Sequence, residues 1–218
     1  MYIPPSNAEH DQNVIFDFIQ GNPFGALVTV SADGLLATHI PLVLDRTRGA
    51  HGALEGHIAR ANPQHSEQLT APESLIIFSG PDAYITPTWY PTKQEHGKVV
   101  PTWNYVAVHA YGLLTFTDDA AFLLRHLEQL TGQQETGRDP AWAVSDAPAD
   151  FIAQQARAIV GFEFAITRLE GKWKMSQNRS DADIDGVIGG LGKSAVSGDL
   201  VVADIVASRR PTFHSPGQ

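Results

Sequence analysis

The sequence predicts a mainly β protein with α-helices packed around it, built on about six antiparallel strands that close or nearly close into a barrel. Runs of β-branched and aromatic residues alternate with clusters of Gly, Pro, Asn and Asp, which is the pattern of short strands joined by tight connections. Apolar stripes at helical spacing interrupt these runs and supply packing helices. Many strands with short connections favour a barrel. The predicted strands span 24–30, 35–44, 52–58, 74–79, 103–117 and 159–169.

Capping residues mark where the predicted helices begin. Asp11 precedes an apolar stripe that ends near Gly21. Asn62 followed by Pro63 opens a short helix through Leu69, because Pro is tolerated at the first helical position. Four further apolar stripes predict helices over 122–130, 151–155, 184–191 and 200–206. The third follows a Ser-x-x-Asp capping box at 180–183.

The composition describes a globular protein without thiol chemistry. Its 218 residues suit one domain over 1–192 followed by a helical extension over 193–218, with a tail that frays from Arg209 onward. The absence of Cys excludes disulfides and Cys-ligated metals. With 15 Lys and Arg against 24 Asp and Glu, the net charge of −9 disfavours direct nucleic-acid binding. No apolar run is long enough to cross a bilayer, so we expect a soluble, cytoplasmic protein.

The segment 171–179 concentrates cations on this acidic chain. It carries Lys172, Lys174 and Arg179 together with an indole, a hydroxyl and two amides. Cations and hydroxyls donate charge-assisted hydrogen bonds to phosphate, and the indole of Trp173 offers a flat face to a ring system. The segment therefore predicts a site for a nucleotide-like cofactor. The alternative is a solvated basic turn in which Trp173 only anchors the core.

Two further groups of residues could complete such a site. Thr38 and His39 on one predicted strand, with His57 and Arg60 at the end of another, would line one edge of the barrel if the strands pair. The alternative is a pair of hydrogen-bonded strand histidines and a surface Arg. No carboxylate or third His lies at ligand spacing, so no metal site is expected. The aromatic loop 84–91 could form the wall of a ring-binding pocket or a hydrophobic plug between subunits.

Five motifs follow one another along the chain: Met1-Tyr2-Ile3-Pro4-Pro5, Gly56-His57-Ile58-Ala59-Arg60-Ala61-Asn62-Pro63, 83–91, Val99-Val100-Pro101-Thr102-Trp103-Asn104-Tyr105 and Gly171-Lys172-Trp173-Lys174-Met175-Ser176-Gln177-Asn178-Arg179. In this order they resemble the PaiB family, also called the FMN-binding negative transcriptional regulators. The resemblance runs from Met1 to about Leu191. It implies a six-stranded split barrel related to the pyridoxamine-5′-phosphate oxidases, a homodimer, and FMN at the dimer interface.

The resemblance also implies residue roles. Basic and hydroxyl side chains would hold the flavin phosphate, and aromatic and amide groups would surround the ring. The phosphate candidates are Arg60, Lys174, Ser176 and Arg179. The ring candidates are Thr38, His39, Trp103, Asn104, Trp173 and Gln177, with His57 on the neighbouring strand.

Three functions follow from the resemblance and the residues. The first is an FMN-binding protein, with a flavin-dependent oxidoreductase as one candidate activity, since the flavin would carry the electron transfer. The second is a transcriptional regulator that acts through a small molecule or a partner protein, because no basic helix suited to a DNA groove is present. The third is haem binding or haem degradation, as in related split barrels.

Overall fold

The computed structural model describes residues 1–66 and 69–211. These residues form two compact units, each assembled from distant parts of the chain. Unit 1 comprises 1–10, 79–107 and 170–218, and unit 2 comprises 11–78 and 108–169. The predicted tail begins at Arg209, and most of it lies outside the described residues.

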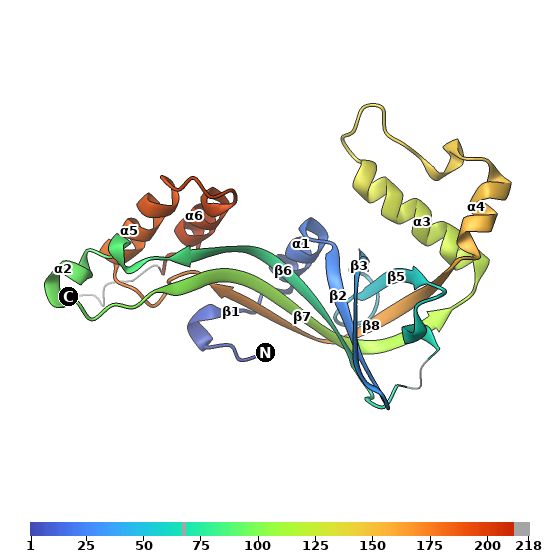
Figure 1. Cartoon of the computed structure of the whole chain (residues 1–218), viewed down its shortest axis with the longest axis horizontal. Helices are drawn as coiled ribbons and strands as arrows, with labels where there is room; N and C mark the ends of the chain where they lie inside the picture. The colour runs from blue at the N-terminus through green and yellow to red at the C-terminus, as the bar shows by residue number, and fades with distance from the viewer. Residues whose placement is uncertain (67–68, 212–218) are drawn as a thin grey trace. The chain divides into compact units, whose positions relative to one another are not determined.

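The fold is mainly β with helices, as predicted, and its strands form one sheet (Figure 1). The hydrogen-bonded order is β3-β2-β6-β7-β8-β5-β4, with β1 pairing to β8. The strands are β1 (Ala8–Glu9), β2 (Phe24–Ser31), β3 (Gly34–Pro41), β4 (Val43–Asp45), β5 (Ala53–Ala59), β6 (Ser74–Ile85), β7 (Thr102–Thr117) and β8 (Ile159–Lys174). The α-helices are α1 (Gln12–Gly21), α2 (Thr92–His96), α3 (Ala120–Glu135), α4 (Ala149–Ala156), α5 (Asp181–Leu191) and α6 (Asp199–Ser208). Single 3₁₀ turns are η1 (Pro5–Asn7), η2 (Pro63–His65), η3 (Pro87–Trp89) and η4 (Val144–Asp146).

In unit 2, alternation along the strands places one face in the core. Every second residue of β2 is buried, as period-2 geometry requires when one face is covered. β2 and β3 pair as an antiparallel hairpin from Phe24 opposite Pro41 to Ser31 opposite Gly34. The Asp11 side chain caps α1 by accepting a hydrogen bond from the Asn13 backbone N–H. The helices α3 and α4 follow β7 and precede β8 in the chain, and they pack against each other (Figure 1).

In unit 1, α5 and α6 lie side by side (Figure 1), and α5 contacts η3 of the aromatic loop 84–91. The Ser180 side chain caps α5 by accepting a hydrogen bond from the Asp183 N–H, as the capping-box spacing predicts. A Cβ added at Gly190 would lie 2.2 Å from the indole ring of Trp89. At Gly186 it would lie 1.9 Å from the Trp89 carbonyl oxygen. Trp89 therefore packs against the face of α5 that carries Gly186 and Gly190, within the same chain.

The strand count differs from the prediction: the described residues form eight strands, not six. The predicted strand 35–44 is interrupted at Leu42, whose N–H bonds to the Pro23 carbonyl instead of a sheet partner, so β4 is separate. The two-residue strand β1 is too short for periodicity to reveal. The predicted helix 63–69 was too long, because η2 ends at His65 and Leu69 bridges Ser31.

Among the residues that the structure describes, none of the helices combines the length and apolar character needed to cross a membrane.

Candidate functional site

The basic cluster, defined as Lys172, Lys174 and Arg179, lies in unit 1 at the end of β8 and in the turn that follows. The Lys174 ammonium donates hydrogen bonds to the Trp103 carbonyl oxygen at 2.6 Å and to the Thr102 hydroxyl. Burial lowers the pKa of Lys174, and the charges of Lys172 and Arg179 lower it further. An anion at this position would relieve the repulsion among the three cations.

The other two cations of the cluster rest on aromatic rings. The Lys172 ammonium lies 5.1 Å from the ring centroid of Tyr105 and donates to the Tyr2 carbonyl at 3.1 Å. The Arg179 guanidinium lies 4.8 Å from the ring centroid of Tyr90. Within the described ranges, no carboxylate pairs with any member of the cluster. The cluster is therefore a positive site without an internal counter-ion.

An exposed aromatic pair, Tyr84 on β6 and Trp103 on β7, adjoins the cluster. The relative exposure is 49% for Tyr84 and 53% for Trp103, and the two rings meet edge to face with centroids 5.9 Å apart. Because the Trp103 backbone carbonyl accepts the Lys174 hydrogen bond, the ammonium lies beside the residue that carries the exposed indole. Large exposed rings of this kind mark contact surfaces for a ligand or a partner.

Of the other predicted residues of unit 1, Trp173 is buried, with the Arg209 guanidinium 5.0 Å from its ring centroid, so its indole does not offer an exposed face. Asn104, Ser176 and Gln177 support the turn. Asn104 and Ser176 are buried and exchange two hydrogen bonds, of 3.0 and 3.2 Å. Ser176 has φ +62°, in the left-handed region that non-glycine residues rarely adopt. The Gln177 amide donates to the Trp173 carbonyl at 2.5 Å and accepts from the Met175 N–H at 2.7 Å. These contacts hold the basic cluster in place.

Thr38 and His39 lie in unit 2, where Thr38 belongs to a polar network that sequence reasoning missed. The Thr38 hydroxyl donates to Gln64 at 2.6 Å and accepts from the Asn62 amide at 2.9 Å. Gln64 is fully buried and also donates to the Thr29 hydroxyl at 2.9 Å. His39 is exposed and stacks on Phe24. The Asn-Pro-Gln sequence at 62–64 was readable as a helix cap, but nothing local placed Gln64 beside Thr38.

The half-buried His57 pairs with the buried His126 of α3. Its Nδ1 lies 3.0 Å from His126 Nε2. Burial lowers the pKa of His57. Burial, followed by the neighbouring charges of His57 and Arg125, lowers the pKa of His126 to about 4. Both rings are therefore neutral at pH 7, and the pair acts as a hydrogen-bonded packing contact.

Arg60 is held by internal partners of unit 2. Its guanidinium donates to the carbonyl oxygens of Arg157 and Ile159, both at 2.8 Å, and pairs with Asp118 at 2.7 Å. The phosphate role predicted for Arg60 would require it to leave or share these partners.

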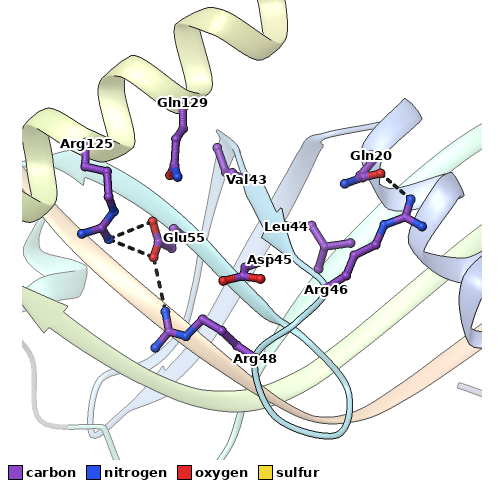
Figure 2. A pocket seen from close by; sticks show the side chains of 9 residues that line it. All are labelled: Gln20, Val43, Leu44, Asp45, Arg46, Arg48, Glu55, Arg125 and Gln129. Atoms are coloured by element: carbon purple, nitrogen blue, oxygen red, sulfur yellow. Dashed lines mark hydrogen bonds and ion pairs between the residues drawn. The ribbon is translucent and has the colours of Figure 1, made fainter.

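An arginine-rich pocket of about 570 Å³ lies in unit 2 and surrounds Glu55 (Figure 2). Arg48 and Arg125 converge on the buried Glu55 carboxylate, at 3.3 and 3.1 Å. Arg46 pairs with Asp17 at 2.6 Å. Each guanidinium already has an acidic partner, so this pocket is an ion-pair network and a weaker anion site than the basic cluster.

Known proteins resemble this chain in sequence and in fold. Residues 1–168 match the family described as "Putative FMN-binding domain". Protein AN0679 of Emericella nidulans is 36% identical over 96% of this chain and 97% of its own length. Protease synthase and sporulation protein PAI 2 of Bacillus subtilis is 32% identical over 86% of this chain and 87% of its own length.

Among solved structures, the flavocytochrome Anf3 from Azotobacter vinelandii has a TM-score of 0.59 at 13% identity, covering 82% of this chain and 74% of that one. The FAD and heme binding protein from Mycobacterium smegmatis has a TM-score of 0.55 at 16% identity, covering 82% of this chain and 79% of that one. At these identities the likeness concerns the fold alone. The match over 1–168 and the similarity to the Bacillus protein show that the chain belongs to the PaiB-type family of FMN-binding domains.

Proposed function

We propose that the protein binds FMN in unit 1, with the phosphate on the basic cluster and the isoalloxazine ring against the exposed aromatic pair. One observation carries this proposal: Lys174 contacts Trp103 of the exposed aromatic pair, and neither Lys174 nor its neighbouring cations Lys172 and Arg179 have a carboxylate partner in the described chain. FMN combines the two features that such a surface recognises, a phosphate and a flat ring system.

The donor set fits the phosphate of FMN. Ammonium and guanidinium groups donate charge-assisted hydrogen bonds to phosphate oxygens, and a bound dianion would favour the charged form of Lys174. Asn104, Ser176 and Gln177 would act by holding the turn that carries the cations. The described partners of Thr38, His57 and Arg60 are internal to unit 2, so the proposal does not depend on them.

Bound FMN supplies electron-transfer chemistry, so we further propose a flavin-dependent oxidoreductase. In that role the residues of unit 1 bind and orient the cofactor. Family membership supports a flavin ligand. The visible absorption spectrum of the purified protein separates this proposal from the haem alternative, because oxidised flavin and haem absorb at different wavelengths.

The test is a fluorescence titration with FMN and with riboflavin, which lacks the phosphate. FMN should bind at least tenfold more tightly, because a charge-assisted hydrogen bond contributes about 1.5–3 kcal/mol. Lys174→Gln should weaken FMN by about tenfold and leave riboflavin nearly unchanged. Lys193→Gln removes an exposed cation elsewhere in unit 1 and serves as the control. Equal affinities for FMN and riboflavin would reject the phosphate assignment.

A further inference from the structure

A cavity of about 630 Å³ lies in unit 2 between α3, η4 and α4, and its lining includes no residue used in the proposed flavin site. Its walls are mainly apolar, with Leu123 and Leu124 from α3 and Ile152 from α4. Small-molecule sites in proteins have this size and this apolar character, with a few polar groups that orient the ligand.

Alanines create the space on the α4 side. Ala149, Ala153 and Ala156 line the cavity at a spacing of four and three residues, which places them on one face of the helix. Larger side chains at these positions would fill the gap between α3 and α4. The helical pair therefore leaves a groove open to solvent where it could have packed closely.

The charged groups of the cavity are unevenly distributed. Arg60 and Arg157 lie at the same end, because the Arg60 guanidinium donates to the Arg157 carbonyl at 2.8 Å. Asp118 neutralises Arg60. Arg157 is exposed, and no acidic partner for its side chain occurs in the described part of the chain. Glu128 also lines the cavity, but it lies about 12 Å along α3 from the first residue of that helix.

We propose that this cavity binds a small amphipathic organic anion: an apolar body of about two rings that carries one carboxylate or sulfonate group. The apolar body fits between the leucines of α3 and the alanines of α4. The anionic group fits the end where Arg157 supplies a cation that has no counter-ion among the described residues. This site is distinct from the flavin site and requires no flavin chemistry.

The test uses two fluorescent probes that differ in one charged group, 8-anilinonaphthalene-1-sulfonate and the uncharged N-phenyl-1-naphthylamine, with the full chain saturated with FMN. Both probes should bind once per chain. Arg157→Gln should weaken the sulfonate probe by about tenfold, the loss of one charge-assisted contact, and leave the neutral probe unchanged. Arg138→Gln removes an exposed Arg outside the cavity and should change neither probe.

A second pair of variants tests the location. Ala153→Trp should fill the cavity and weaken both probes at least tenfold, whereas Gln154→Trp, at an exposed position of the same helix outside the cavity, should not. Hydrogen exchange of the unmodified protein should show added protection in α3 and α4 when the sulfonate probe binds. The proposal is overturned if the two Trp variants bind the probes equally, or if the protection appears outside α3 and α4. It is also overturned if Ala153→Trp dissociates a dimer without affecting the probes, because a second copy would then occupy this face.

Discussion

Replacing Gly190 with Ala tests the close contact between Trp89 and α5. A Cβ at this position would lie 2.2 to 2.5 Å from three carbons of the Trp89 indole, which is rigid and cannot fold away. Overpacking of this kind costs about 1–3 kcal/mol. The neighbouring Gly189 lies in the same helix and has nothing within 4 Å of its added Cβ, so it is the matched control.

The two substitutions share the helix-propensity gain and differ in the clash. Gly→Ala in a helix interior stabilises by about 0.8–1 kcal/mol, so Gly189→Ala should raise the free energy of unfolding by that amount. Gly190→Ala should range from neutral to about 2 kcal/mol destabilising, because the clash opposes the same gain. The difference between the two variants should therefore be about 1–3 kcal/mol.

Removing the Trp89 indole should abolish the cost of Gly190→Ala but not the cost of Gly186→Ala. In a Trp89→Ala background, Gly190→Ala should become stabilising, with a coupling energy of about 1–3 kcal/mol. Gly186→Ala should stay destabilising in both backgrounds, because its added Cβ would meet the Trp89 backbone carbonyl at 1.9 Å. Urea unfolding followed by far-UV circular dichroism measures each free energy. Equal shifts for Gly189→Ala and Gly190→Ala would refute the reasoning.

Four further expectations concern pH, charge, assembly and DNA. The pKa of His126 is lowered chiefly by burial, from 6.5 to about 4. At 1.36 kcal/mol per pKa unit, the free energy of unfolding should therefore be highest above pH 6.5 and fall by about 3 kcal/mol as the pH drops toward 4, because only the unfolded state binds the proton in this range. In urea titrations His126→Leu should make this fall smaller, whereas His10→Leu, at an exposed position, should leave it unchanged. Glu55→Gln should lower the free energy of urea unfolding by about 1.5–3 kcal/mol because two arginines contact its buried carboxylate, whereas the more exposed Glu163→Gln should cost less than about 1 kcal/mol. The exposed aromatic pair predicts a homodimer by light scattering at micromolar concentration, and a monomer with FMN bound would contradict it. At −9 per chain a dimer carries −18, so fluorescence anisotropy should detect no sequence-specific duplex binding tighter than about micromolar at physiological salt; nanomolar selective binding would favour the regulator instead.

Local patterns were sufficient for much of the fold. Asp11 and Ser180 were identified as helix caps, and both accept the expected backbone hydrogen bond. A helix cap and an apolar stripe involve residues within one or two helical turns of each other, so all the interacting residues are close together in the sequence. The same is true of strand alternation, which located the predicted strands but not their full lengths. The ordered motifs also identified the family, which the match over 1–168 confirms.

The contacts that arrange the candidate sites depend on residues far apart in the chain. His57 meets His126 across 69 positions, and Lys174 meets Trp103 across 71. The chain alone could not reveal that Gln64 anchors Thr38, that Arg60 is neutralised by Asp118, or that Trp89 sits on Gly190. Such pairs form because strand pairing and core packing bring distant segments together, and a one-residue change of register would turn strand side chains such as Thr38 and His57 to the opposite face. Residue chemistry therefore indicated an anion and ring site, while tertiary packing decided which cations are already paired and which have no counter-ion within the described part of the chain.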